Sequence, residues 1–285
     1  MKKVIILLAG LGWLSVPLAA QDGEDGVPCS VNEGTTIGIG RYNLASSYVS
    51  PPGEKNISYT GLGLRVLNER MKLVSPQFSL QQIFHVDLSM TQNPGATISA
   101  ISGIIDYTYG YHYRFYPADN LKLLVGPSLR GMSGFIYNTQ SANNSTALNL
   151  DIDLNLSVAA LYTLSLRGSP LTLRYQAELS SAGVLFAPDY GQSYYEIFGL
   201  GNMAGVVQFS SFHNKLAMRN YLTADIPLRK FTVRTGYMNN LYSTNINSVR
   251  THHFSHSFMI GLVKEFVSFK GKELKKRHMY KSAYY

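Results

Sequence analysis

The chain has a single cysteine, Cys29, so no internal disulfide can hold its 285 residues together. Cys29 lies too far beyond the N-terminal apolar run to be a lipid-modified cysteine, and we interpret it as inert. The run itself, VIILLAGLGWL at residues 4–14, is about half the length that a membrane-spanning helix needs, and no longer one follows it. A disulfide scaffold and a helical membrane protein are therefore excluded.

Sequence signatures of cofactor chemistry are missing as well. The chain has neither a phosphate-binding glycine loop nor the cysteine and histidine spacing of a zinc site, so we expect no cofactor and no metal. The formal net charge is +8, but much of it comes from Lys2, Lys3 and six basic residues in the segment 270–285. The remaining body is close to neutral, which argues against a nucleic-acid partner.

Two-residue alternation is what the chain has in abundance. In ALNLDIDLNLSVAALYTLSLR, residues 147–167, every even position from Leu148 to Leu166 is apolar, whereas most odd positions are polar. Such alternation is typical of a half-buried strand, and this one is about three times as long as an ordinary soluble strand. Similar runs occur at residues 36–48, 56–67, 77–90, 97–116, 121–137, 171–181, 215–226, 231–241 and 254–266. We therefore predict ten strands and no amphipathic helix of ordinary length.

The connections between these strands alternate in size. Short turns are predicted at residues 117–120, 168–170 and 229–230, with a longer linker after Asn68 at the same end. Longer loops are predicted at residues 50–55, 91–96, 138–146, 187–213 and 241–250. Short turns at one end and long loops at the other are typical of outer-membrane barrels. The fold class is therefore predicted as all-β, an antiparallel up-and-down transmembrane β-barrel of about ten strands (8 to 12).

The chain ends complete the predicted organisation. Residues 1–20 combine Lys2 and Lys3, the apolar run and a small-residue exit, which is the pattern of a secretory signal peptide. We expect a flexible periplasmic segment at 21–34, the barrel at 35–269 and a basic periplasmic tail at 270–285. The predicted location is the bacterial outer membrane, with both termini in the periplasm.

The charged face of the strands is predicted to point into the barrel. A barrel of about eight strands is only just filled by its side chains, so ten strands of inward Leu, Phe and Tyr would overfill it. The apolar face should therefore contact lipid. The predicted lumen charge network contains Arg65, His85, Asp87, Asp106, His112, Arg114, Lys122, Arg130, Asp151, Asp153, Arg174, Glu178, Lys215, Arg219, Asp225, Arg234 and Glu265. Cations and anions are nearly balanced, which favours ion pairs across a closed lumen.

Aromatic residues are predicted to mark the membrane boundary. Tyrosine rings prefer the interface between lipid and water, and one strand carries an unbroken outward row of aromatic residues near the short-turn end. The predicted aromatic girdle is Tyr107, Tyr109, Tyr111, Tyr113 and Phe115. The alternative interpretations of such a row are a sugar-binding platform and a plain sheet face, and we favour the girdle. The glycine-rich loop 187–213 could cap the barrel, lie on the membrane or bind a partner, and we favour a cap.

Two residue pairs raise the hypothesis of an enzyme. His253 and Ser255 have the His-x-Ser spacing of outer-membrane phospholipases, but both fall on the predicted lumenal face, and no orienting Asn or Asp follows at a suitable offset. His85 and Asp87 could form a base dyad as in ten-stranded surface proteases, but we favour a lumenal hydrogen-bonded pair without a catalytic role. The polar cluster around His213 has no recognisable nucleophile. We predict no catalytic residues.

One segment carries a family resemblance. FHNKLAMRNYLTADIPLRKFTVRTGYMNNLYSTNINSVRTHHFSHSFMIGLVKEF, residues 212–266, together with the signal peptide and the Gln21 start, resembles an uncharacterised outer-membrane β-barrel family of the Bacteroidetes. The resemblance extends over most of the mature chain and implies fold and location. It supplies no catalytic residues.

The predicted function is that of a structural or surface-interaction barrel with a charge-filled, closed lumen. A narrow selective channel is the second hypothesis, and an outer-membrane lipid- or protein-modifying enzyme is the third. The expected partners are outer-membrane lipid, the barrel-assembly machinery during insertion and a periplasmic partner of the basic tail.

Overall fold

The computed structural model describes residues 30–50, 57–139, 146–166, 169–228, 231–267 and 282–283. The predicted signal peptide, Cys29, most of the predicted basic tail and residues 167–168 and 229–230 lie outside these ranges. The strand β1 begins at Ser30, within the segment assigned above to the N-terminal region. The domain boundaries otherwise stay predictions.

Strands account for nearly all of the described residues. Their bounds are β1 (Ser30–Ser46), β2 (Tyr59–Ser75), β3 (Phe78–Gln92), β4 (Ser99–Ala118), β5 (Leu121–Asn138), β6 (Thr146–Leu166), β7 (Ser169–Phe186), β8 (Val207–Ser211), β9 (Lys215–Pro227), β10 (Thr232–Ile246) and β11 (Val249–Val267). One π-helical turn, η2 (Tyr195–Gly199), lies between β7 and β8. Within the described ranges, no helix is long and apolar enough to cross a membrane.

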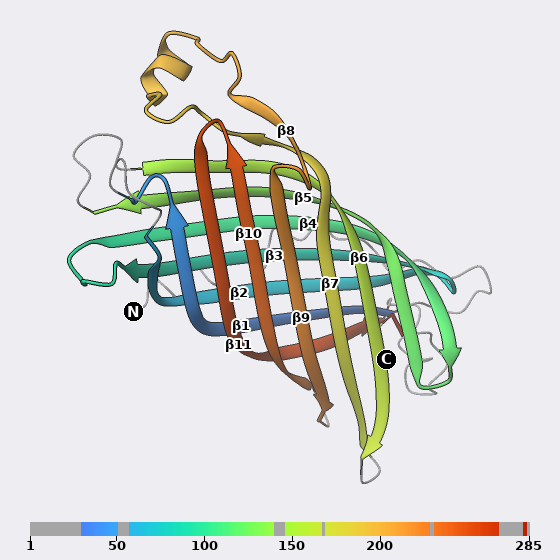
Figure 1. The fold of residues 1–285 in the computed structure, drawn as a ribbon. Coiled ribbons are helices and arrows are strands. Elements are labelled where there is room, and N and C mark those ends of the chain that lie inside the picture. Colours follow the sequence, from blue (N-terminus) through green and yellow to red (C-terminus); the bar gives the residue numbers. More distant parts are fainter. Residues whose placement is uncertain are drawn as a thin grey trace.

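The strands close into an antiparallel barrel (Figure 1). The order around the wall is β6-β5-β4-β3-β2-β1-β11-β10-β9-β7, and the pairing of β7 with β6 closes it. The short strand β8 pairs with the upper part of β7, above the part that pairs with β9, so it continues the line of β9. The predicted fold class, a barrel of about ten strands, is confirmed.

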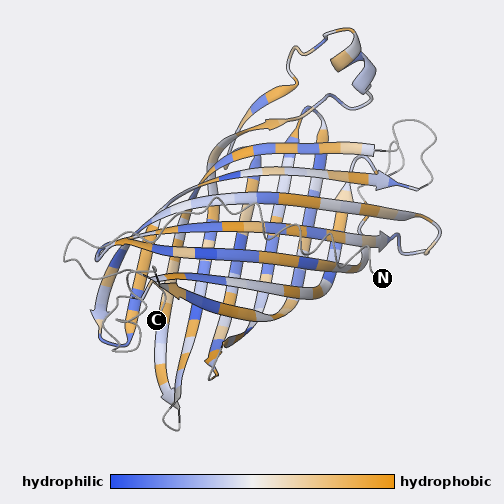
Figure 2. Ribbon diagram, turned by 180° about the vertical axis from the view of Figure 1, so that it is seen from behind, coloured by the Kyte–Doolittle hydropathy of each residue, from blue (hydrophilic) through white to orange (hydrophobic). Residues whose placement is uncertain are grey.

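The two faces of each strand differ as the alternation predicts. Asp151 and Asp153 are 4% and 0% exposed, whereas Leu150, Ile152 and Leu154 on the same strand are 38%, 54% and 50% exposed. Apolar and polar residues alternate along the strands of the whole wall in Figure 2. Side chains that point into the barrel are buried by the rest of the wall, whereas those that point outward are exposed. The ionic side of β6 therefore faces the lumen, and the leucine side forms the outer surface.

Two predicted connections are wrong. The loop predicted at 241–250 is a hairpin, because β10 runs to Ile246 and β11 begins at Val249. Asn247 and Ser248 make the turn with φ angles of 51° and 61°, a left-handed pair that matches the twist of tight hairpins. The long linker predicted after Asn68 is wrong as well, since β2 continues to Ser75.

The connection between β7 and β8 projects beyond the neighbouring strands (Figure 1). It is anchored by the buried side chains of Ile197 and Val206. The Asn247 side chain donates hydrogen bonds to its carbonyls at Ala187 (2.6 Å) and Gly205 (3.0 Å). The β10–β11 turn therefore holds both ends of this connection in place.

The outer wall also carries one polar row, which the sequence did not predict. Tyr175 donates to Asn220 (2.8 Å), Asn220 lies 3.4 Å from Asn239, and Tyr237 lies 2.6 Å from Nδ1 of His256. These residues come from the neighbouring strands β7, β9, β10 and β11. Mutual hydrogen bonds lower the cost of polar groups on a surface that faces lipid.

Candidate functional site: the lumen

The lumen receives the side chains of the predicted charge network. Those of Arg65, His85, Asp87, Asp106, His112, Arg114, Asp151, Asp153, Arg174, Glu178, Lys215, Arg219, Asp225 and Arg234 are buried. Arg130, Lys122 and Glu265 are half-buried. Because these side chains come from strands on all sides of the wall, they meet inside the barrel.

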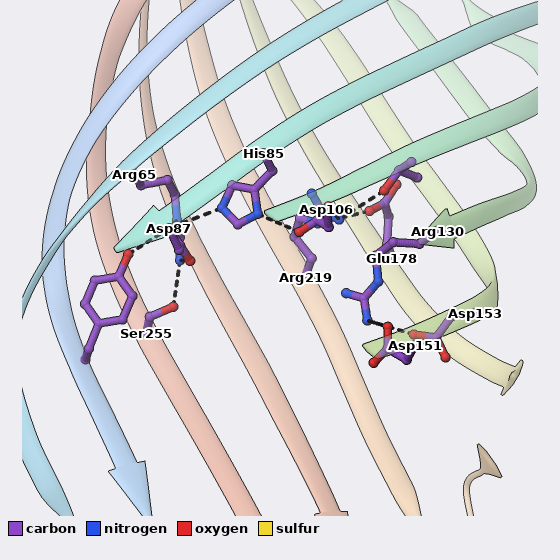
Figure 3. Close-up of polar contacts among 12 residues, drawn as sticks. Arg65, His85, Asp87, Asp106, Arg130, Asp151, Asp153, Glu178, Arg219 and Ser255 are labelled. Atoms are coloured by element: carbon purple, nitrogen blue, oxygen red, sulfur yellow. Dashed lines mark hydrogen bonds and ion pairs between the residues drawn. The ribbon is translucent and has the colours of Figure 1, made fainter. Parts of the chain in front are cut away.

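One group of them, here termed the loop-side ionic layer, consists of Arg65, His85, Asp87, Asp106, Glu178 and Arg219 (Figure 3). The Arg65 guanidinium donates two hydrogen bonds to the Asp87 carboxylate, of 2.7 and 2.6 Å. It also donates one to the hydroxyl of Ser255 (2.7 Å). Tyr42 donates to the same carboxylate at 2.9 Å. Asp87 is therefore held from two neighbouring strands, β1 and β2.

His85 lies between two carboxylates of this layer. Its Nδ1 is 2.6 Å from Asp106, and its Nε2 is 3.2 Å from Asp87, an ion-pair distance without hydrogen-bond geometry. Arg219 reaches Asp106 at 3.0 Å from the far side and lies 3.2 Å from Glu178. The layer thus runs across the lumen from β2 to β7.

A second group, the turn-side ionic layer, is centred on Glu69. Arg174 and Arg234 donate to its carboxylate at 2.6 and 2.7 Å, and Gln81 donates at 2.5 Å. Arg234 also donates two hydrogen bonds of 2.7 Å to the Asp225 carboxylate. β2 and β7 lie five strands apart in either direction around the wall, so the contact of Glu69 with Arg174 spans the full width of the lumen.

An apolar layer separates the two ionic layers. It consists of Leu67, Ile83, Tyr221, Met238 and Met259. Leu67 lies between Arg65 and Glu69 along β2, which fixes the order of the three layers. A void of about 10 Å³ borders this layer, room for a single water molecule.

A third ionic cluster lies nearer the loop end. Lys215 is 2.7 Å from Asp151 and 2.8 Å from Asp153, and Arg130 is 2.7 Å from Asp153. These residues come from β9, β6 and β5. The two carboxylates of β6, Asp151 and Asp153, are thus paired with two cations from other strands.

Each end of the lumen carries an apolar cluster. At the turn end, Met71, Leu73, Leu124, Ala159 and Leu161 surround Ala283 of the C-terminal tail. Arg114 donates to the Ala283 carbonyl (3.0 Å), and the Ala283 N–H donates to Ser30, whose hydroxyl in turn donates to Glu265 (2.5 Å). Two of the predicted network residues, Arg114 and Glu265, therefore help to anchor the tail.

At the loop end, Leu44, Val49, Tyr59, Ala100, Ile136 and Ala147 form the corresponding cluster. Tyr59 donates to the carbonyl of Val49 (2.8 Å), which ties the β1–β2 connection to the wall. Burial, with the neighbouring Tyr194 phenol as a second cause, raises the pKa of Tyr48 in this connection to about 12. Tyr48 is therefore neutral at physiological pH.

Besides Arg114 and Glu265, two more predicted network residues lie outside the ionic layers. His112 is buried, but neither ring nitrogen has a hydrogen-bond partner in the part of the chain that the structure describes. Lys122 lies at the turn end, where Arg114 and Glu265 are its charged neighbours. The side chains of the predicted girdle, Tyr107, Tyr109, Tyr111, Tyr113 and Phe115, stand on the outer wall and are 39% to 48% exposed.

The residue pairs considered for catalysis have other partners. Ser255 accepts a hydrogen bond from Arg65, and the ring of His253 lies against Tyr42 at 5.7 Å. His213 lies outside the lumen, and its Nδ1 is 2.6 Å from the hydroxyl of Ser211. Among the described residues, no group of three or more His, Cys, Asp or Glu side chains could hold a metal ion.

Glu69 is the residue that the sequence interpretation missed. The alternation Arg65, Leu67, Glu69 puts a leucine on the inward face, so β2 was predicted to stop before Glu69. The alternation nevertheless continues past Leu67, because Arg65, Glu69 and Met71 all stand at odd-numbered positions of β2 and therefore share one face of the strand. Gln81 and Gln176 fall on the predicted polar faces, but they and Tyr42 were left out of the predicted network because neutral side chains do not stand out in a charge pattern.

Comparison with known proteins adds family and fold. The family model DUF3316, a protein family of unknown function, matches residues 4–273. No curated protein matches the chain.

Several solved barrels are similar in structure. The outer membrane protease OmpT from Escherichia coli aligns with a TM-score of 0.50 at 10% identity, over 83% of this chain and 97% of that one. The transport unit of the autotransporter AIDA-I from Escherichia coli gives 0.49 at 11% identity, over 93% and 97% of the two chains. The translocator domain of NalP from Neisseria meningitidis gives 0.39 at 12%, over 93% and 95%. At these identities the likeness concerns the fold alone, which is that of an outer-membrane β-barrel.

Proposed function

Since the chain belongs to DUF3316, a family of proteins of unknown function, we propose its role from the geometry of the lumen: it is an outer-membrane barrel closed by internal ion pairs, with a structural or surface-interaction role. Its proposed location is the bacterial outer membrane, with both termini in the periplasm. Its partners are outer-membrane lipid, the barrel-assembly machinery during insertion and a periplasmic partner of the basic tail. Origin in the Bacteroidetes stays a prediction.

The outer wall supports the membrane location. Large apolar side chains stand exposed on all sides of it, among them Ile39 (57%), Leu62 (64%), Leu129 (54%), Phe258 (75%) and Ile260 (63%). In water, an apolar surface of this extent would drive aggregation, whereas in a bilayer it meets hydrocarbon.

One contact carries the closed-lumen proposal: Glu69 on β2 bridges Arg174 on the opposite strand β7. Both side chains are at most 2% exposed. A buried charge without its partner is costly, so a solute would have to part these groups and leave them unpaired in order to pass. The loop-side ionic layer and the cluster of Asp151, Asp153, Lys215 and Arg130 would oppose it in the same way.

The loop-end surface supports the surface-interaction role. The connection between β7 and β8 exposes Tyr195 (71%), Phe198 (61%) and Leu200 (65%) at its tip. Exposed aromatic and apolar clusters of this kind are common at protein interaction sites.

Single-channel recording in planar bilayers tests the closed lumen. We expect no discrete openings from the wild-type barrel. A Glu69→Ala, Arg174→Ala, Arg234→Ala variant removes the turn-side layer alone, and we expect it to stay silent as well, because the loop-side ionic layer still blocks the lumen. Discrete openings in the wild type would establish the second candidate, a narrow selective channel.

The third candidate, an enzyme, is tested through the three histidines that the sequence analysis singled out. His85, His213 and His253 are replaced by alanine one at a time, and the turnover of phospholipid and peptide substrates is compared with that of the wild type. We expect no turnover that depends on any of them. Loss of a measurable activity in the His213→Ala variant would overturn the assignment, because His213 is exposed and its replacement leaves the lumen intact.

A further inference from the structure

The outer wall is grooved on one side. A groove of about 470 Å³ runs across β4, β5, β6 and β7 to β8, and its lining is almost entirely apolar. Its volume lies within the range of about 300–1,000 Å³ that is usual for small-molecule sites. It lies on the outward face of the barrel, separate from the ionic layers of the lumen.

Two small residues of β5 make the floor of this groove. An added Cβ at Gly131 would meet nothing within 4 Å. The strand register places large apolar side chains on both sides: Tyr107 and Ile152 flank Gly131, and Ile105 and Leu150 flank Ser133. Because the flanking side chains are 38% to 54% exposed, they stand as walls above the floor.

An aromatic stack marks the end of the groove nearest the loops. Phe186, which lines the groove, is stacked on Tyr194 at 6.5 Å and on Phe198 at 6.0 Å. The Tyr194 hydroxyl accepts a hydrogen bond from the backbone of Leu148 (2.6 Å), which fixes the stack to the top of β6. Aromatic rings of this kind prefer the interface between hydrocarbon and headgroups.

We propose that this groove binds one fatty acyl chain of a membrane lipid, with the lipid headgroup at the Phe186–Tyr194–Phe198 stack. Against hydrocarbon the hydrophobic effect offers no gain, so binding depends on close packing. An empty groove would forfeit dispersion contacts along its floor, which a flexible chain restores. A second barrel presents a convex wall and would not reach Gly131. The inference rests on the proposed membrane location.

Photo-cross-linking tests the proposal. The barrel is inserted into phosphatidylethanolamine vesicles that contain a trace of phosphatidylethanolamine with a diazirine on one acyl chain. We expect the label to concentrate on peptides of β4, β5 and β6. Gly131→Leu fills the groove and should reduce this labelling several-fold, whereas Ala224→Leu, which adds bulk to the outer face of β9, should leave it unchanged.

Three outcomes would overturn the proposal. Equal labelling around the whole wall would reveal ordinary boundary lipid, and unchanged labelling in Gly131→Leu would place the label elsewhere. In a separate Cys29→Ser, Ser133→Cys variant, disulfide-linked dimers formed under oxidising conditions would identify a second copy as the occupant. Ser133→Leu is the second variant in case Gly131→Leu does not fold, as judged by circular dichroism. Absence of label from every strand would refute the membrane location itself, an outcome distinct from an even distribution.

Discussion

At the scale of single residues, Glu69 shows why the lumen is a network and not a set of pairs. One carboxylate takes hydrogen bonds from Arg174, Arg234 and Gln81, while Asp225 supplies the second partner of Arg234. Arg174 and Arg234 therefore each depend on a carboxylate from another strand. Removing one anion affects two cations at once.

Glu69→Gln should destabilise the barrel by about 3–5 kcal/mol, because it removes the buried carboxylate charge that Arg174 and Arg234 share. Glu33→Gln, on the outer face of β1, is the matched control and should cost less than about 1 kcal/mol. Guanidinium unfolding in detergent micelles measures both. Replacing Arg174 by Met in the Glu69→Gln background should recover much of the loss, and equal stability of the single and double variants would contradict the network.

At the scale of elements, the tight turns fix the strand register. Asn247 and Ser248 both adopt positive φ, which asparagine tolerates better than serine. The same turn holds the long β7–β8 connection through the Asn247 side chain. One hairpin thus shapes both the wall and the loop-end surface.

Ser248→Gly should stabilise the barrel by up to about 1 kcal/mol, because glycine adopts φ near 61° without strain. Ser248→Val should destabilise it, since a β-branched residue is a true outlier there. Denaturant midpoints of the two variants in the same detergent provide the measurement. Identical midpoints would show that the turn is free to change its conformation.

The tail is an element as well, and the structure places Ala283 inside the turn-end mouth. Deleting residues 282–285 should expose Leu124, which is 1% exposed in the intact chain. In a Cys29→Ser background, Leu124→Cys should react faster with a water-soluble maleimide after the deletion. Val125→Cys on the outer face is the control and should react at the same rate with or without the tail. An unchanged rate at position 124 would mean that the tail does not cover the mouth.

At the scale of the whole molecule, the barrel reverses the arrangement of a soluble protein. Its interior holds charged layers, and its outer surface holds leucine, isoleucine and aromatic side chains. Such an arrangement is stable only where hydrocarbon replaces water at the outer surface.

The chain without residues 1–20 should therefore fold only in detergent or lipid. Refolding from urea into micelles should give a β-rich circular dichroism spectrum, whereas refolding into plain buffer should give aggregates. Light scattering and circular dichroism distinguish the two. A folded monomer in plain buffer would refute the membrane location.

The sequence by itself determined the architecture, because alternation with a period of two encodes which side of each strand is covered. It placed Asp151 and Asp153 opposite Leu150 and Ile152, and the structure agrees. It was wrong where the inward face carries apolar residues, as at Leu67, because the pattern there no longer distinguishes inside from outside.

Only the tertiary structure decided which charges meet. Arg174 and Glu69 lie 105 residues apart in the chain, and their contact depends on the closure and stagger of the wall, which no local pattern records. The same holds for the groove over Gly131, which exists because of the side chains that the register places on either side. Local periodicity specifies the faces of a strand, whereas partners across a lumen or along a wall are set by how distant strands are brought into register.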